Sequence, residues 1–255
     1  MISIITPTYE TPPHVLARTW ESLKKQTYTN WEWVVWDDSI SEAVYRQVYG
    51  YCNDERYKIN LYRSHKNIGN IGMVKLSAFM QGEGELLVEL DHDDELVPTA
   101  LAELWEAYLL NSAEFFYSNC CEINSAGQSC KYPEGWAFGY GSEYYDDEYG
   151  VWVMRAPEIN ATTMSHIVSM PNHLRAWTSQ AYHALGGHNP SYKVADDYEL
   201  MVRTMLKYEY YHIDKLLYKQ YIGDTTAQRV HNAEIQQRVA EISNKYANAI
   251  KDKFA

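Results

Sequence analysis

Two aspartates, Asp91 and Asp93, directly follow an apolar run at residues 86–90 that is typical of a buried strand. Carboxylates spaced two apart at the end of a strand supply hard oxygen ligands that Mg²⁺ or Mn²⁺ can share with a diphosphate. Open α/β sheets bind their ligands at this edge. The segment is equally consistent with a solvated acidic turn that caps the next helix, since Asp94 precedes Pro98 and a helical pattern.

Three further polar clusters end or follow predicted strands in the first half of the chain. Because parallel strands end at one edge of a sheet, we expect these clusters to lie beside the aspartate pair. An aromatic face such as that of Tyr9 can stack on a nucleotide base, and the Asp38 carboxylate can accept from a base N–H. The clusters predict a nucleotide site, although the chain has neither a G-x-G-x-x-G nor a Walker sequence. The clusters are Pro7-Thr8-Tyr9, Asp37-Asp38-Ser39 and Asn67-Ile68-Gly69.

The elements that must position these clusters alternate between short apolar runs and helical patterns. This alternation predicts an α/β fold with a parallel, doubly wound sheet. Strands are expected at residues 2–6, 33–36, 59–62, 86–90 and 115–118. Helices are expected at 42–51, 71–80 and 98–110, together with one that opens at Pro12 and has Thr11 as its cap.

The second half of the chain has a less regular pattern. Residues 119–171 are rich in Gly, Tyr, Trp and acidic side chains and predict hairpins and loops, with a candidate lid at 142–149. Helices are expected near 177–185 and at 197–207, and strands at 210–213 and 216–221. A last helix has an apolar face that packs on the core or, alternatively, binds a second subunit. That face comprises Ile235, Val239, Ile242, Tyr246 and Ile250.

Composition limits the partners of the protein. The chain has 255 residues, of which 46% are hydrophobic, so it can bury the core of one large domain. Its formal net charge of −12 argues against nucleic acid as a partner, whereas a metal-bridged anion remains compatible. No apolar stretch is long enough for a transmembrane segment and no leader pattern opens the chain, so we expect a cytoplasmic protein, with a peripheral position at a membrane as a variant.

The motifs together resemble glycosyltransferase family two, whose members have the GT-A fold. The resemblance extends over nearly the whole chain, and the order and spacing of the motifs make it specific. They are IITPTY at 4–9, WDDS at 36–39, Asn67-x-Gly69, DHDD at 91–94 and Gly186-Gly187 leading to ADDYEL at 195–200. The resemblance implies a mostly parallel, Rossmann-like sheet flanked by helices, an irregular acceptor-side region and a C-terminal helix.

The resemblance also implies roles for single residues. The base of the donor would contact Tyr9 and Asp38, Asp93 would bind the divalent cation directly, and Asp91 would reach the ribose or the metal. A late histidine in many relatives corresponds to His231 as a further metal ligand, which favours Mn²⁺ over Mg²⁺. Asp197 corresponds to the catalytic base, a carboxylate that deprotonates the acceptor hydroxyl during an inverting transfer. Apart from the resemblance, the acidic residues at 196–197 favour a helix N-terminus, where negative charge is stabilising.

The sequence departs from the family at Val74, where relatives commonly carry an arginine that holds the donor. Lys75 beside it is expected to take that role with less geometric specificity. Acceptor contacts are expected from Asp196, Arg175 and Trp177. The donor contacts expected in full are Pro7, Thr8, Tyr9, Asp38, Asn67, Lys75, Asp91 and His92.

We therefore expect a metal-dependent, inverting glycosyltransferase that moves a sugar from a nucleoside-diphosphate donor, UDP-linked in particular, to a hydroxyl of a saccharide or glycolipid. Within one domain, residues 1–118 would bind the nucleotide sugar, 119–230 would bind the acceptor and carry the base, and 231–255 would form the C-terminal helix. The alternatives are a non-catalytic protein that binds nucleotide sugars or glycans, and a sugar-1-phosphate nucleotidyltransferase, which would normally show a Gly-rich, basic loop near the N-terminus.

Overall fold

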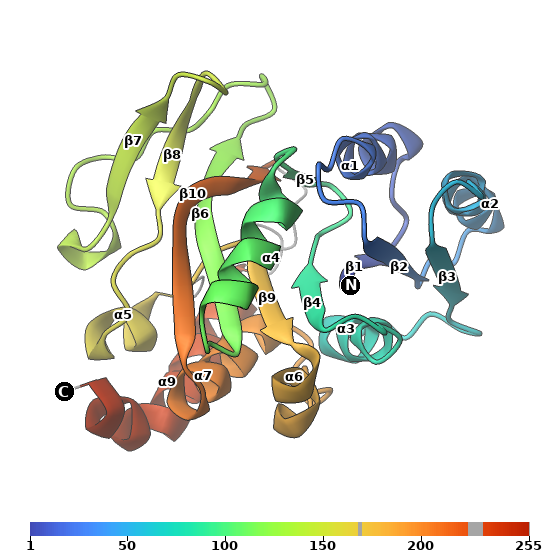
Figure 1. Cartoon of the computed structure of the whole chain (residues 1–255). Helices are drawn as coiled ribbons and strands as arrows, with labels where there is room; N and C mark the ends of the chain where they lie inside the picture. The colour runs from blue at the N-terminus through green and yellow to red at the C-terminus, as the bar shows by residue number, and fades with distance from the viewer. Residues whose placement is uncertain (168–169, 224–231, 255) are drawn as a thin grey trace.

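The sheet of the protein begins with four parallel strands in the order β3-β2-β1-β4 (Figure 1). The computed structural model describes residues 1–167, 170–223 and 232–254. Almost every residue of β1 and β2 is buried, which is typical of parallel strands with helices on both faces. The expected strands are confirmed here, with ends that differ by one to two residues. They are β1 (Ile2–Thr8), β2 (Trp31–Asp37), β3 (Ile59–Arg63) and β4 (Leu86–Glu89).

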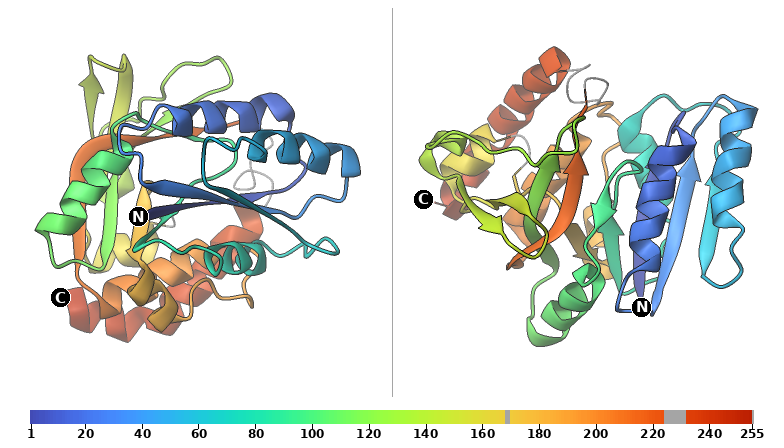
Figure 2. Two further views of the ribbon diagram at one scale, coloured as in Figure 1. Left: turned by 45° about the vertical axis from the view of Figure 1, so that its right-hand side comes forward. Right: turned by 90° about the horizontal axis from the view of Figure 1, so that it is seen from above.

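Helices cover both faces of this half-sheet (Figure 2). On one face lie α1 (Pro13–Lys24) and α2 (Glu42–Cys52), and on the other lies α3 (Ile71–Phe79). The prediction that Thr11 caps α1 is wrong, because Pro12 occupies the cap and no side chain bonds to the first turn. A proline suits this position, since its φ is already helical and the turn has no partner for an N–H.

The second half of the sheet contains antiparallel as well as parallel pairs. Strand β9 (Arg175–Thr178) runs antiparallel between β4 and β6 (Phe115–Ile123), and β6 then pairs in parallel with β10 (Tyr210–Tyr221). The short strand β5 (Glu95–Leu96) closes the edge against β10. Two predictions are corrected here: residues 210–213 and 216–221 form one strand with a bulge, and Trp177 lies in β9, not in a helix.

The remaining helices support the second half. α4 (Ala100–Leu110) packs on β6 and β10, while α6 (Ser179–Leu185) and α7 (Asp196–Lys207) lie on the same face as α3 (Figure 2). The Thr178 side chain accepts from the backbone N–H of Ala181, which is why α6 begins after Thr178. None of the helices in the described ranges is both long enough and apolar enough to cross a membrane.

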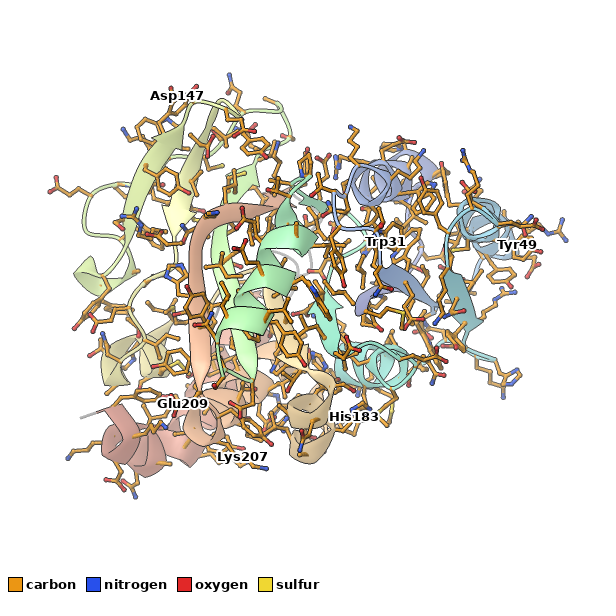
Figure 3. All side chains as sticks on the ribbon, in the orientation of Figure 1. Trp31, Tyr49, Asp147, His183, Lys207 and Glu209 are labelled. Atoms are coloured by element: carbon orange, nitrogen blue, oxygen red, sulfur yellow. The ribbon has the colours of Figure 1, made fainter. Side chains whose placement is uncertain are left out.

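The irregular region forms a hairpin and a helix. The hairpin pairs β7 (Ser142–Asp146) with β8 (Val151–Arg155), so the candidate lid at 142–149 has regular strand pairing, and Asp147 lies at its outer tip (Figure 3). The three-residue 3₁₀ turn η1 (Ala137–Gly139) precedes it. Helix α5 (Ala161–His166), which the sequence pattern did not predict, begins at a capping box between Asn160 and Thr163.

The C-terminal helix α9 (Asn232–Phe254) packs on α5 and α7. Ile242 and Ile250 on its apolar face are almost completely buried, and the Tyr246 hydroxyl donates to Glu199 of α7 at 2.8 Å. This confirms the prediction that the face packs on the core. The alternative, in which the same face binds a second subunit, is wrong because the chain itself covers the face.

Candidate functional site

The turn after β4 presents Asp91 and Asp93, and α1 fixes its backbone. Thr19 Oγ1 donates to the carbonyls of His92 and Asp94 at 2.8 and 2.9 Å, and Arg18 donates to the Asp93 carbonyl. Asp91 Oδ2 lies 3.7 Å from His173 Nε2. The Asp93 side chain is partly exposed.

Asp94 has a structural role that differs from its neighbours. Its carboxylate is buried and accepts from the Tyr218 hydroxyl and the Tyr221 N–H, both at 2.7 Å. Burial and the charges of Asp93 and Asp91 raise the pKa of Asp94 well above its usual range. The interpretation of this segment as a cap of the next helix is wrong for Asp94, because Thr99 precedes α4 and Asp94 joins the turn to β10 instead.

The other predicted strand-end clusters meet as expected beside this turn. Tyr9 at the end of β1 is 51% exposed, and the backbone N–H of Asp38 donates to the Thr8 carbonyl at 2.9 Å. The Asp38 carboxylate is buried and already accepts from Asn67 Nδ2 at 2.8 Å and from the Ile68 N–H at 2.9 Å. An N–H of a nucleotide base would therefore bind to the same Asp38 oxygens that hold the segment after β3 in place.

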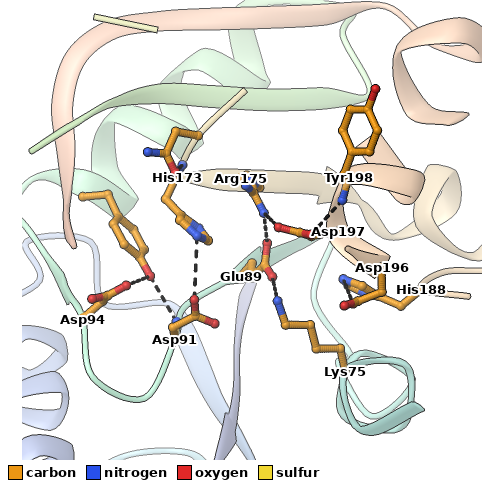
Figure 4. Close-up of polar contacts among 12 residues, drawn as sticks. Lys75, Glu89, Asp91, Asp94, His173, Arg175, His188, Asp196, Asp197 and Tyr198 are labelled. Carbon is orange, nitrogen blue, oxygen red and sulfur yellow. Dashed lines mark hydrogen bonds and ion pairs between the residues drawn. The ribbon is translucent and has the colours of Figure 1, made fainter. Parts of the chain in front are cut away.

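A chain of alternating charges connects the two halves of the sheet (Figure 4). Lys75 Nζ of α3 lies 2.5 Å from Glu89 Oε1 of β4, and Glu89 Oε2 lies 3.2 Å from Arg175 Nη1 of β9. The same Nη1 lies 3.0 Å from Asp197 Oδ2 at the start of α7. Glu89 is fully buried, whereas the Asp197 side chain is 29% exposed and so reaches solvent. Charges at this depth need partners, and each has one.

The two neighbouring carboxylates of α7 differ in protonation. Burial by itself raises the pKa of Asp197, but Arg175 and Lys75 together hold that pKa below its ordinary value. Burial raises the pKa of Asp196 to about 7, against the attraction of Lys75. Its Oδ2 lies 3.8 Å from His188 Nε2, and burial lowers the pKa of His188 to about 3. At neutral pH Asp197 is therefore ionised, and His188 is uncharged.

The side chains of four predicted contacts are buried. Lys75 pairs with Glu89, and Arg175, 1% exposed, is enclosed between two carboxylates. Trp177 lies in the core, where its Nε1 donates to Thr204 Oγ1 at 3.0 Å. Asp196 is buried against His188. The most exposed of these side chains is Lys75, at 11%, and a direct contact of the four with donor or acceptor stays a prediction.

Other residues of the site were missed from the sequence. His173 stacks on Tyr218 with ring centroids 4.5 Å apart and contacts Asp91, and Glu89 connects Lys75 to Arg175. Glu89 had a signal, because a charged residue inside an otherwise apolar strand requires a buried partner. His173 had none, since its contacts are to residues far away in sequence.

The donor set of the turn fits a divalent cation that takes ligands from a substrate. Within residues 1–167, 170–223 and 232–254, no three His, Cys, Asp or Glu side chains could hold a metal ion by themselves. Asp91 and Asp93 are both partly exposed, so their carboxylates could supply the protein ligands of a site that phosphate oxygens and water complete. His231, the third predicted ligand, lies outside the described residues.

The chain is similar in sequence to known proteins. The family model for glycosyl transferase family 2 matches residues 3–165. The Escherichia coli UDP-Glc:alpha-D-GlcNAc-diphosphoundecaprenol beta-1,3-glucosyltransferase WfgD is 30% identical over 125 residues, which cover 49% of this chain and 47% of that protein. The chain spans less than half the length of the curated relatives it matches.

Two solved structures share the fold. TarS 1-349 of S. aureus in complex with UDP-GlcNAc has a TM-score of 0.68 at 19% identity, covering 94% of this chain and 66% of that one. GalNAc-T7 with UDP, GalNAc and Mn2+ has a TM-score of 0.67 at 15% identity, covering 97% of this chain and 49% of that one. The expected GT-A fold, a mostly parallel sheet between helices with a C-terminal helix, is thereby confirmed.

Proposed function

The chain belongs to glycosyl transferase family 2, and from that membership we propose that it transfers a sugar from a nucleoside diphosphate, UDP in particular, to a hydroxyl of a saccharide or glycolipid. The observation that carries the proposal is Asp197, a carboxylate that is ionised, partly exposed and fixed by Arg175. His173, two residues before Arg175, contacts the strand-end Asp91, while Arg175 contacts Asp197.

The donor would bind at the carboxyl edge of β1 to β4. The exposed ring of Tyr9 is suited to stack on the base, with Pro7, Thr8 and the Asn67 segment forming the surrounding wall. Asp91 and Asp93 would hold Mn²⁺ or Mg²⁺ on the diphosphate, with His231 as a further ligand. That cation would neutralise the charge that develops on the departing diphosphate.

Asp197 would act as the general base of an inverting transfer. It would remove the proton from the acceptor hydroxyl while that oxygen attacks the anomeric carbon, and the bond to the diphosphate would break on the opposite side. This step needs no covalent nucleophile. Arg175 would keep the Asp197 carboxylate ionised and oriented between catalytic cycles, at 3.0 Å from its Oδ2.

The acceptor would enter from the side of the β7–β8 hairpin. A cavity of about 150 Å³ opens there next to Asn172, one residue before His173, and the rings of Tyr132 and Trp136 line it with Gln220. Flat aromatic faces and amide groups suit a sugar ring. Because the E. coli relative is named for a diphosphoundecaprenol-linked acceptor, we include lipid-linked saccharides, which would place the protein peripherally at a membrane in the cytoplasm.

The test is release of UDP from a panel of UDP-sugars with Mn²⁺, with and without saccharide acceptors. Asp197→Asn is expected to reduce transfer by about 10²- to 10⁴-fold, the usual contribution of a general base, while UDP binding by calorimetry stays unchanged. Asp147→Asn at the hairpin tip is the matched control. Near-normal transfer by Asp197→Asn would refute the base, and UDP binding without turnover of any donor would favour a non-catalytic binding protein.

A further inference from the structure

Arg175 has two carboxylates on one nitrogen. Its Nη1 lies 3.2 Å from Glu89 Oε2 and 3.0 Å from Asp197 Oδ2, while its Nε donates to the Pro171 carbonyl at 3.0 Å and so fixes the plane of the guanidinium. Arg175 and Glu89 are each at most 1% exposed, so water cannot replace either partner. A stronger contact between Arg175 and one of these carboxylates therefore weakens its contact with the other.

We propose that Glu89 is a positioning residue for the transfer reaction: it shares Arg175 with Asp197, and thereby limits how strongly Arg175 binds the base. The inference rests on the proposed function, because it takes Asp197 as the base. Lys75 in turn holds the second oxygen of Glu89 at 2.5 Å, so that Glu89 stays ionised and aimed at Arg175.

The chemistry requires such a balance. A carboxylate bound by an arginine alone is a weak proton acceptor, and general-base catalysis falls as the pKa of the base falls. The negative charge of Glu89 raises the pKa of Asp197, in opposition to the lowering by Arg175 and Lys75. Burial and the charge of Asp197 both raise the pKa of the neighbouring Asp196, which reaches about 7, and His188 Nε2 lies 3.8 Å from Asp196 Oδ2.

A purely structural role for Glu89 would have a different signature. If Glu89 did no more than neutralise Lys75, its removal would lower stability, and in a Lys75→Met background it would leave the titration of Asp197 where it is. The shared nitrogen predicts in addition that the two removals shift the Asp197 midpoint in opposite directions. Removing Glu89 strengthens the contact between Arg175 and Asp197, whereas removing Arg175 abolishes it.

The test is a ¹³C NMR titration of the aspartate carboxyl groups, in which Asp197 is assigned by its absence in Asp197→Asn. Glu89→Gln is expected to shift the Asp197 midpoint to lower pH, and Arg175→Gln to higher pH. The matched control is Glu32→Gln, since Glu32 is also fully buried and has a lysine partner, Lys58 at 2.8 Å, yet does not contact Arg175. The control should leave the midpoint unchanged.

Because Glu89→Gln leaves Lys75 unpaired in the core, the comparison is repeated in a second background. Lys75→Met and Lys75→Met/Glu89→Gln differ in the charge of Glu89 alone, and the double variant is expected to have the lower midpoint. A midpoint that stays or rises when Glu89 is neutralised, in either background, overturns the inference.

The titration needs no substrate, which separates the inference from the proposed function. If the titration shifts follow the predicted pattern but the protein turns over no donor, the proposed function is refuted, while the inference that Glu89 and Asp197 share Arg175 still holds. Where turnover is found, the acid limb of kcat/KM is expected to follow the same order of variants, since this limb reports the free enzyme's base.

Discussion

Replacing Lys75 by methionine is expected to destabilise the fold, because it leaves the fully buried carboxylate of Glu89 without its nearest cation. Breaking a buried ion pair by removing one partner typically costs about 3–5 kcal/mol. Arg175 still contacts Glu89 at 3.2 Å, so we expect the lower end of that range. At roughly 2–4 °C per kcal/mol for a chain of this size, the expected loss of about 3 kcal/mol lowers Tm by about 6–12 °C at neutral pH.

The loss should depend on pH in a defined direction. Burial by itself raises the pKa of Glu89, but Lys75 and Arg175 hold it well below its usual range. Its stabilising contribution is therefore complete above the ordinary glutamate pKa and disappears as pH falls through the lowered value in the folded protein. The difference between Lys75→Met and the parent should be largest at neutral pH and should shrink in acid.

Urea unfolding of the parent and Lys75→Met at neutral and acidic pH measures both effects. Lys75→Met/Glu89→Leu should recover most of the loss, because well-packed apolar residues often replace a buried ion pair without cost. The control is Arg46→Ala, which breaks the exposed pair with Glu42 and should change little. A loss in Lys75→Met no greater than in the control would refute the reasoning.

Three further changes probe the site. Asp93→Asn should weaken Mn²⁺ binding in the presence of UDP by at least about tenfold, since even groups that only orient metal ligands contribute that much; unchanged calorimetric affinity would contradict the metal assignment. Asp38→Ala should cost about 1–3 kcal/mol in urea unfolding and weaken UDP binding, because it leaves the Ile68 N–H without an acceptor; parent-like stability would argue against that role. Since burial lowers the pKa of His188 to about 3, the unfolded state binds its proton first and stability falls as pH drops from about 6.5; His188→Phe should reduce this slope, and an unchanged slope would exclude the histidine as its source.

The donor side of the site could be predicted from sequence because local patterns carry it. Each cluster, such as Asp91-His92-Asp93, follows a short apolar run, and parallel strands bring their ends to one edge without further information. The ion pairs that join Lys75, Glu89 and Arg175 could not be predicted from sequence. The three residues come from α3, β4 and β9, and no local pattern indicates which charges meet in a core. The direction of β9 was missed for the same reason.

Thr178 illustrates a signal that was present but not used. A helix was expected near 177–185, yet Thr178 is a typical cap residue whose side chain accepts from Ala181, so the helix had to begin after it. With Trp177 returned to a strand, its place opposite Leu87 of β4 and Phe115 of β6 explains its burial. The acceptor contact expected of Trp177 stays a prediction, for a side chain that is only 1% exposed.

The position of Arg175 directly opposite Glu89 also bears on how the chain avoids assembling incorrectly. If β9 paired one residue out of step, every side chain on it would turn to the other face of the sheet, and the guanidinium would lie among the apolar side chains there. Such a misaligned sheet would leave Asp197 without Arg175 and Glu89 without its second cation. The charges thus select one alignment of the two halves, and we expect refolding of Lys75→Met/Glu89→Leu to produce more misassembled protein than the parent, even where its final stability is the same.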